Sequence, residues 1–312
     1  MRVGIVGLPN VGKSTLFNAL TRQRVPAANF PFTTVEPNVG IVPIPDERLA
    51  AVAKVAGSRK VTPATIEVVD IAGLVKGAHQ GEGLGNEFLA HVRPMDALIH
   101  VVRIFDDPDV ARAGSLSPAE DVTVIRAELE AKDAELAARR EAKKQEVQER
   151  TETKLAAKPV LYVLNTGEDL RTPPSAAPLR PAVVLSGKLE AELSELYGDD
   201  QRTFLQAYGL EHPRVEDIIH ALITLLDLVT FFTANRNEAR AWLLPRGATA
   251  WEAAGKVHAD FQRGFIRAET IAWDALVEAG SYVAARKRGL LRDEGKDYAV
   301  QDGDVLLFKV DT

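Results

Sequence analysis

The residues best suited to chemistry lie close to the amino end of the chain. Residues Gly7–Ser14 read GLPNVGKS, which matches the pattern G-x-x-x-x-G-K-S. In this pattern backbone N–H groups surround phosphate oxygens, the lysine reaches the β- and γ-phosphates, and the serine hydroxyl ligates Mg²⁺. We therefore expect Lys13 and Ser14 to hold a nucleoside triphosphate together with its magnesium ion.

The elements on either side must place this loop correctly. Arg2–Val6 has the composition of a short buried strand. Ser14–Leu20 begins a helix whose large apolar residues fall on one face, namely Leu16, Phe17 and Leu20. A helix N-terminus directs free N–H groups and the positive end of its dipole toward an anion. The alternative is a strand-to-helix turn whose glycines serve only backbone geometry, but the order of strand, loop and helix favours phosphate binding.

Two further segments supply groups for the metal and the γ-phosphate. The string D-I-A-G, from Asp70 to Gly73, ends an apolar strand. Asp70 is predicted to hold Mg²⁺ through a water, and the Gly73 amide to bond the γ-phosphate. Asn29–Thr34 reads NFPFTT, in a loop where a threonine can complete the magnesium shell only when a γ-phosphate is present. We favour Thr34 over Thr33 as this sensor of nucleotide state.

A third segment is placed to read the base. Asn165–Glu168 reads NTGE and directly follows the apolar run 160–164. Ordinary GTPases have N-K-x-D here, where the aspartate accepts two hydrogen bonds from guanine. In this chain Thr166 replaces the lysine, and Glu168, one methylene longer, replaces the aspartate. Both changes weaken guanine recognition, because a misplaced carboxylate leaves buried donors unpaired.

Adenine is the other candidate base, since its amino group offers a donor within reach of Asn165 or of a backbone carbonyl. Ser186 and Gly187 follow the expected strand 182–185 and are predicted to close over the base. The base motif thus leaves ATP and GTP both open, with ATP favoured.

Position 74 bears on the rate of hydrolysis. A glutamine after D-x-x-G orients the attacking water in Ras-like enzymes, but this chain has Leu74. An alkyl side chain cannot align water, so intrinsic hydrolysis should be slow unless another group helps. The candidates are a monovalent cation near Asn10, with K⁺ as a second cofactor beside Mg²⁺, a backbone carbonyl, or a group from a partner. The glycine-rich loop 76–85 is expected to respond to the γ-phosphate.

Composition narrows the class of protein. The chain has 312 residues, 46% hydrophobic and 26% charged, with no cysteine, which excludes disulfides and thiolate metal sites. A net charge of −6 argues against broad non-specific binding of nucleic acid. The first strand occupies the position of a signal peptide, and the most apolar stretch, Ile218–Phe232, is too short to span a bilayer. We expect a soluble cytoplasmic protein with no membrane partner.

The order of elements predicts an α/β fold. Apolar runs at 65–70, 97–102, 160–164 and 182–185 alternate with helical segments, which indicates a mostly parallel sheet with ligands beyond the carboxyl ends of its strands. Residues 117–157, rich in Ala, Glu, Lys and Arg, predict one long helix or a short helical hairpin. From about Leu228 short apolar stretches and turns indicate a small α+β domain. The expected domains are 1–116 with 158–227, then 117–157, and 228–312.

Two groups of basic residues could contact nucleic acid. The helical insertion carries Arg139, Arg140, Lys143 and Lys144, although a solvated face with alternating charges is the favoured interpretation. The C-terminal domain carries a second group that is equally well explained as a basic face or as scattered solvated charges: Arg263, Arg267, Arg286, Lys287, Arg288 and Arg292.

The motifs together resemble the YchF (Obg-like ATPase) family of translation-factor-related P-loop proteins. The resemblance covers nearly the whole chain and is carried by the strings Gly7–Thr15, Asn29–Thr34, Asp70–Leu74, His79–Asn86, Asp260–Glu269 and Gly295–Asp304. It implies a P-loop G domain, a helical insertion, and a C-terminal TGS domain with a ubiquitin-like fold associated with RNA or ribosome binding. Members of the family bind and slowly hydrolyse ATP, often alongside GTP, and associate with ribosomes.

Carried over residue by residue, the resemblance assigns catalytic roles to Lys13, Thr34 and Gly73, and Mg²⁺ binding to Ser14, Thr34 and, through a water, Asp70. The nucleotide-binding residues it implies are Asn10, Val11, Gly12, Lys13, Ser14, Thr15, Asn165, Thr166, Glu168, Ser186 and Gly187.

This chain departs from the family pattern in three places. The helical insertion looks about half the usual length. Ala111-Arg112 stands where relatives continue toward a histidine. Thr166-Gly167 is an unusual filling of the base motif. Because the insertion is short, binding of a partner at its tip is not carried over from the family. No histidine role is carried over to positions 111–112. The unusual base motif weakens the case for strict ATP preference.

The leading hypothesis is a ribosome-associated switch that binds and slowly hydrolyses ATP to ADP and phosphate with Mg²⁺, with RNA contact through the TGS domain and helical arm. One rival is a GTP-preferring Obg-type GTPase. Another, from a different class, is a nucleotide-gated binding protein with negligible turnover, which Leu74 motivates. A metabolic kinase ranks last, because no acceptor site is recognisable.

Overall fold

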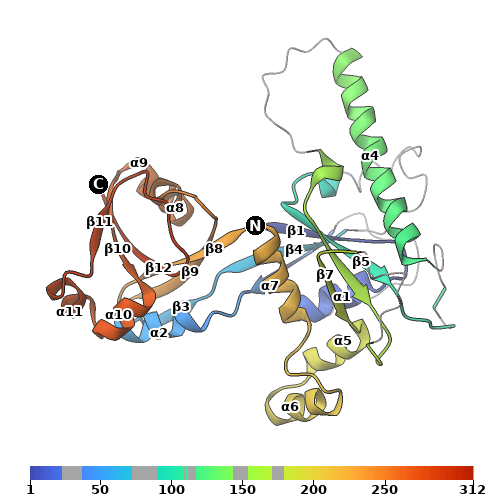
Figure 1. Ribbon diagram of the computed structural model, residues 1–312, viewed down its shortest axis with the longest axis horizontal. Helices are drawn as coiled ribbons and strands as arrows, with labels where there is room; N and C mark the ends of the chain where they lie inside the picture. Colours follow the sequence, from blue (N-terminus) through green and yellow to red (C-terminus); the bar gives the residue numbers. More distant parts are fainter. Residues whose placement is uncertain are drawn as a thin grey trace. The chain divides into compact units, whose positions relative to one another are not determined.

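The computed structural model describes residues 1–22, 37–71, 90–108, 110–111, 117–142, 154–170 and 179–311, with side chains in the long helix described up to residue 138 (Figure 1). The chain forms two compact units. The first combines Met1–Val42 with Ile66–Leu225, and the second combines Pro43–Thr65 with Leu226–Thr312.

The first unit is built on a six-stranded sheet in the order β2-β4-β1-β5-β6-β7. β1 pairs in parallel with β4 and β5, β5 with β6, and β6 with β7. The mostly parallel sheet predicted from the sequence is therefore confirmed, and the carboxyl ends of these strands meet at one edge. The strands are β1 (Arg2–Val6), β2 (Asn38–Pro43), β4 (Thr65–Asp70), β5 (Ala97–Arg103), β6 (Val160–Asn165) and β7 (Ala182–Leu185).

Helices and strands of this unit share an apolar core. All seven residues of β5 are buried, as expected of a strand covered on both faces. The first helix buries Leu16, Phe17 and Leu20, the stripe predicted for it. The described helical segments are α1 (Lys13–Thr21), α4 (Pro118–Ala142), the 3₁₀ turn η2 (Leu155–Ala157), α5 (Gly187–Glu195), α6 (Gly198–Ala207) and α7 (Val215–Leu225).

The helical insertion contains one long helix, α4, which runs away from the sheet (Figure 1). Its middle is held in place because the Asp133 carboxylate accepts hydrogen bonds from the backbone N–H groups of Leu155 and Ala156, at 2.9 and 3.0 Å. The choice between a single helix and a hairpin stays open, because residues 143–153 lie outside the described part of the chain, as do the side chains of the four basic residues named above.

The second unit is an α+β fold, as predicted. Its six-stranded sheet has the order β11-β10-β12-β8-β9-β3. The strands are β3 (Lys60–Thr62), β8 (Leu228–Ala234), β9 (Glu238–Pro245), β10 (Phe265–Ala272), β11 (Arg292–Glu294) and β12 (Asp304–Val310). The helices are α2 (Glu47–Ala56), α8 (Ala250–Val257), α9 (Ala259–Arg263), α10 (Trp273–Ala279) and α11 (Tyr282–Lys287).

One segment lies in a different unit from the one expected. The sequence placed residues 43–65 in the G domain, within 1–116, but β3 pairs in parallel with β9 and α2 packs against β8, β9 and α10. The strand pairing is reinforced by side chains, since Thr62 Oγ1 donates to Glu238 at 2.6 Å and Lys60 pairs with the same carboxylate at 3.1 Å. A three-residue polar strand has no periodicity that could reveal such a partner 176 residues away.

The apolar stretch Ile218–Phe232 is divided between α7 and β8, which a turn at 226–227 separates. Within the described residues, no helix combines the length and the apolar character that crossing a membrane would require.

Candidate nucleotide-binding site

The loop between β1 and α1 has the backbone that its glycines permit. Gly12 has a φ of +97° and Asn10 one of +60°, both in the left-handed region. A Cβ atom at Gly12 would lie 2.3 Å from Asn165 Nδ2, and one at Gly7 would lie 2.6 Å from the Val101 carbonyl oxygen. Neither position has room for a side chain, so both must be glycine. The loop leads directly into the first turn of α1, which begins at Lys13.

Lys13 is buried in this loop, with only 8% of its surface exposed. Its ammonium group donates to the Leu8 carbonyl oxygen at 2.9 Å. Burial lowers the pKa of Lys13 to about 8, and the nearby Asp70 carboxylate partly opposes this shift. The loop thus holds a poorly solvated cation next to a helix N-terminus, an arrangement that favours an anion with several negative oxygens.

The two magnesium ligands predicted in the described chain meet directly. Ser14 Oγ donates to Asp70 Oδ2 at 2.8 Å, although the residues are 56 positions apart. Pairing of β1 with β4 places Asp70 opposite Ile5, at the edge where the loop begins. Burial raises the pKa of Asp70, whereas the Ser14 hydroxyl and the Lys13 charge lower it. A hydroxyl and a carboxylate are the hard oxygen donors that Mg²⁺ prefers, so these residues fit that ion.

We expect Asp70→Asn to lower the apparent Mg²⁺ affinity of the nucleotide complex roughly 10- to 100-fold, the usual cost of losing an outer-shell ligand. The amide can still accept the Ser14 hydrogen bond, so the loss would report the missing charge. A Mg²⁺ titration with a fluorescent nucleotide measures the effect. Glu67→Gln is the matched control, because Glu67 lies on the same strand and pairs with Arg2 at 2.9 Å. Equal Mg²⁺ affinities in the two variants would contradict the assignment.

Asn165 joins three parts of the site. Its Nδ2 donates to the Val11 carbonyl oxygen at 2.9 Å, and its Oδ1 accepts from the Gly187 backbone N–H at 2.8 Å. The side chain is buried and so ties the phosphate-binding loop to the end of β6 and to the start of α5. A carboxamide can make two further hydrogen bonds, so contact with a base remains open to it.

Thr166 and Ser186 have local structural partners. The Thr166 hydroxyl and backbone N–H both donate to the Leu185 carbonyl oxygen, at 3.1 and 2.8 Å. The Ser186 hydroxyl caps α5 by accepting from the Leu189 N–H at 3.5 Å. Their side chains therefore hold the base-reading loops in shape, and their contact with a base stays a prediction.

Glu168 is exposed and forms an ion pair with Lys188 at 2.5 Å. The pair joins the two segments expected to surround the base, one after β6 and one at the start of α5. Recognition of a base by Glu168 stays a prediction. The remaining site residues, Thr34 and Gly73, lie outside the described part of the chain, as does Leu74.

The family of the chain follows from its similarity to known proteins. A family model described as "50S ribosome-binding GTPase" matches residues 2–166, and a model of the YchF GTPase C-terminal domain, described as a protein of unknown function, matches residues 228–311. The chain is 40% identical to "Ribosome-binding ATPase YchF" of Bacillus subtilis over 361 residues, covering 99% of each protein. It belongs to the YchF family.

Other relatives agree with this assignment. "Ribosome-binding ATPase YchF" of Pasteurella multocida is 43% identical, covering 99% of this chain and 98% of the relative, and "Obg-like ATPase 1" of Rattus norvegicus is 36% identical, covering 100% and 93%. The structure of the Schizosaccharomyces pombe YchF GTPase superposes with a TM-score of 0.77 at 29% identity, covering 99% and 97%. The predicted resemblance and the P-loop fold are confirmed. The shortened insertion stays a prediction.

A feature of the site that sequence reasoning missed is the loop after β5. Arg103 is buried, and its guanidinium donates to the carbonyl oxygens of Phe105, Asp107 and Val110 at 3.3, 3.1 and 3.1 Å. The carbonyl oxygen of Ala111 then accepts from Asn10 Nδ2 at 3.1 Å. The backbone at Ala111 thus contacts the phosphate-binding loop. A charged residue at the end of a largely apolar strand was the available signal.

Five of the six basic residues named for the second unit pair with carboxylates. Arg267 meets Asp293 at 3.0 Å, Arg286 meets Glu269 at 2.8 Å, and Arg288 meets Glu278 at 3.0 Å. Arg263 and Arg292 also have acidic neighbours, in Asp260 and Glu294. Of the two interpretations given for this group, the pairing favours scattered solvated charges over a continuous basic face.

Proposed function

We propose that this chain is a ribosome-associated, nucleotide-dependent switch that binds and slowly hydrolyses ATP with Mg²⁺. The observation that carries the proposal is that buried Lys13 lies near the Ser14–Asp70 pair at the carboxyl edge of a parallel sheet. The names of the curated relatives, ribosome-binding ATPases, support both the nucleotide and the partner.

In this proposal the residues of the loop between β1 and α1 bind the phosphates and the metal ion. The first N–H groups of α1 and the Lys13 ammonium hold the β- and γ-phosphates and stabilise charge on the leaving group. Ser14 and Asp70 would hold Mg²⁺, which when bound neutralises charge on the phosphate oxygens. Thr34 and Gly73 would sense the γ-phosphate. With Leu74 in the place of a water-orienting glutamine, turnover would be slow, and K⁺ near Asn10 is the second cofactor that we propose.

The base is tested by isothermal titration with ATP and with GTP, each with Mg²⁺. We expect ATP to bind at least as tightly, because Glu168 is longer than the aspartate that guanine requires and pairs with Lys188. GTP binding that is tenfold tighter than ATP binding would replace this proposal with the GTP-preferring alternative.

Turnover is tested separately by single-turnover hydrolysis with and without ribosomes and potassium. Acceleration by either supports the ATPase switch. No acceleration under any of these conditions would instead favour a nucleotide-gated binding protein.

We place the protein in the cytoplasm, where ribosomes are. Contact with RNA through the C-terminal unit or the helical arm is part of the proposal, and it would require arginines such as Arg267 and Arg286 to exchange carboxylate partners for phosphates. Such an exchange is salt-dependent, so ribosome binding measured over a series of salt concentrations tests it.

A further inference from the structure

The segment Pro43–Thr65 connects two strands of the nucleotide-binding sheet but folds within the C-terminal unit. The strand before it, β2, and the strand after it, β4, are neighbours in the first sheet. In the sequence, β2 begins four residues after Thr34, and β4 ends at Asp70. The segment therefore joins the two parts of the chain that the proposed function assigns to magnesium and the γ-phosphate.

The segment is closed at its ends and anchored in its middle. The Ile44 backbone N–H donates to the Ala64 carbonyl oxygen at 2.8 Å, so its two ends lie together. Helix α2 and strand β3 then attach it to the C-terminal sheet. A displacement of β2 or β4 must accordingly be absorbed by this anchored segment or be passed on to the unit that holds it.

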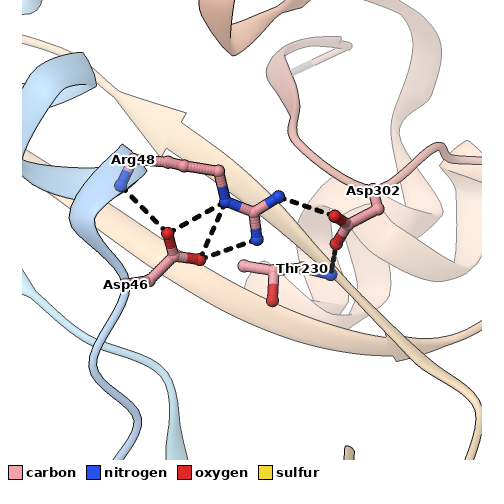
Figure 2. Close-up of polar contacts among 4 residues, drawn as sticks. All are labelled: Asp46, Arg48, Thr230 and Asp302. Carbon is pink, nitrogen blue, oxygen red and sulfur yellow. Dashed lines mark hydrogen bonds and ion pairs between the residues drawn. The ribbon is translucent and has the colours of Figure 1, made fainter. Parts of the chain in front are cut away.

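Arg48 is the centre of the anchor, as Figure 2 shows. Its Nε and one terminal nitrogen donate to the Asp46 carboxylate at 2.9 and 2.8 Å, and its other terminal nitrogen donates to Asp302 Oδ2 at 2.6 Å. The second oxygen of Asp302 accepts from the Thr230 backbone N–H at 2.8 Å. One guanidinium thus connects the start of α2 to the turn before β12 and to strand β8.

The turn that receives Arg48 is held by a backbone hydrogen bond and by close packing. The Gly303 N–H donates to the Thr230 carbonyl oxygen at 2.8 Å, and Gly303 has a φ of +87°. A Cβ there would lie 2.6 Å from the Trp273 ring. The guanidinium also lies over the Phe232 ring, with its carbon 5.5 Å from the ring centre. The turn is thus bonded to β8 and packed against Trp273, so a displacement of Arg48 would be passed to the backbone of the C-terminal unit.

We propose that Arg48 is a positioning residue that couples the nucleotide site to the C-terminal unit. This inference rests on the proposed function. Nucleotide and Mg²⁺ bound at Asp70 act on the end of β4 and through it on its neighbour β2, which lies at the edge of the described sheet and shifts most easily. The shift reaches Asp46 and Arg48 a few residues later and passes to Asp302 and Thr230. By linkage, a partner bound to the C-terminal unit changes nucleotide affinity by the same factor.

The alternative is an anchor that only stabilises the fold. Backbone hydrogen exchange of the full chain separates the two, measured with and without a non-hydrolysable ATP analogue and Mg²⁺. In the unsubstituted protein we expect the analogue to slow exchange in the Gly7–Thr15 loop and to change exchange at the Thr230 and Gly303 amides by about fivefold or more, the lower end of allosteric coupling.

Arg48→Met should keep the response of the phosphate-binding loop and lose the response at Thr230 and Gly303. Arg48→Lys should restore only part of it, because an ammonium cannot reproduce the guanidinium's fork of donors. Arg59→Met is the matched control, since Arg59 is an exposed arginine of the same segment. It should behave like the unsubstituted protein.

Folding of the C-terminal unit is monitored by tryptophan fluorescence, because all three tryptophans, Trp242, Trp251 and Trp273, belong to that unit. If Arg48→Met unfolds it, Asp302→Asn provides the test, because its amide oxygen can still accept from Thr230 while the charge facing Arg48 is removed. A retained response in a folded Arg48 or Asp302 variant would overturn the coupling. So would a loop response without a C-terminal one in the unsubstituted protein. Absence of any loop response would refute the proposed nucleotide site itself.

Discussion

Replacing Lys13 with alanine is expected to lower ATP affinity roughly 100- to 1000-fold, the range found when one partner of a buried charge pair is removed. Lys13 is the buried cation of the phosphate-binding loop, and its ammonium is 2.9 Å from a carbonyl oxygen of that same loop. No other described group is placed to repeat its contact with the phosphates. Isothermal titration with ATP and Mg²⁺ measures the loss.

A pH series gives the same prediction a second readout. Burial lowers the pKa of Lys13 to about 8 in the protein alone, and a bound triphosphate must raise it again. Binding therefore takes up a proton near pH 8, and affinity falls as pH rises through that value, by up to tenfold per pH unit. Titration in two buffers of different ionisation enthalpy detects the proton.

The same pKa has a consequence for folding. For a base whose folded-state pKa lies below its unfolded value, the penalty of burial is fully present below pH 8 and is relieved as the pH rises toward 10.5. Lys13→Ala removes that penalty together with the hydrogen bond to the Leu8 carbonyl oxygen, two changes of opposite sign, so amide exchange in β1 is measured beside binding to show that the first unit stays folded. Lys54→Ala, on the exposed side of α2, is the control. ATP affinity that survives in Lys13→Ala would remove the basis of the site.

The parts of the site that could be predicted from the sequence are those encoded over a few neighbouring residues. A strand, a glycine-rich loop and a helix follow each other within twenty residues, so hydrophobic periodicity and the spacing of Gly7, Gly12, Lys13 and Ser14 were sufficient. The position of Asp70 beside the loop also follows from the sequence, because parallel strands bring their carboxyl ends to one edge, whatever the length of chain between them.

The parts that could not be predicted depend on contacts between distant segments. Asn165 bonds to Val11, 154 positions away, and Arg48 bonds to Asp302, 254 positions away. Neither residue lies in a pattern that distinguishes such a bond from an exposed polar side chain. The placement of residues 43–65 in the second unit was unpredictable for the same reason. Local propensity produces α2 and β3 but does not specify the sheet against which they pack.

Asn165→Ala is the second substitution with a large expected effect. It leaves the Val11 carbonyl oxygen and the Gly187 N–H without their buried partner, at about 1–3 kcal/mol each. We expect a total loss of roughly 2–6 kcal/mol in the free energy of unfolding of the first unit. Nucleotide affinity should fall as well, because Gly12 packs against this side chain and the phosphate-binding loop loses its support.

The position of the tryptophans supplies an internal reference for this measurement. Since all three lie in the second unit, denaturation followed by tryptophan fluorescence should be unchanged in Asn165→Ala, while amide exchange in β1 and β5 should accelerate. Asn165→Asp separates the two bonds: its carboxylate can accept from Gly187 but would face the Val11 carbonyl oxygen without a donor, so it should be at least as destabilising. If both variants matched the unsubstituted protein in exchange and in nucleotide affinity, the loop would be held by its own backbone, and Asn165 would be free to act on the base alone.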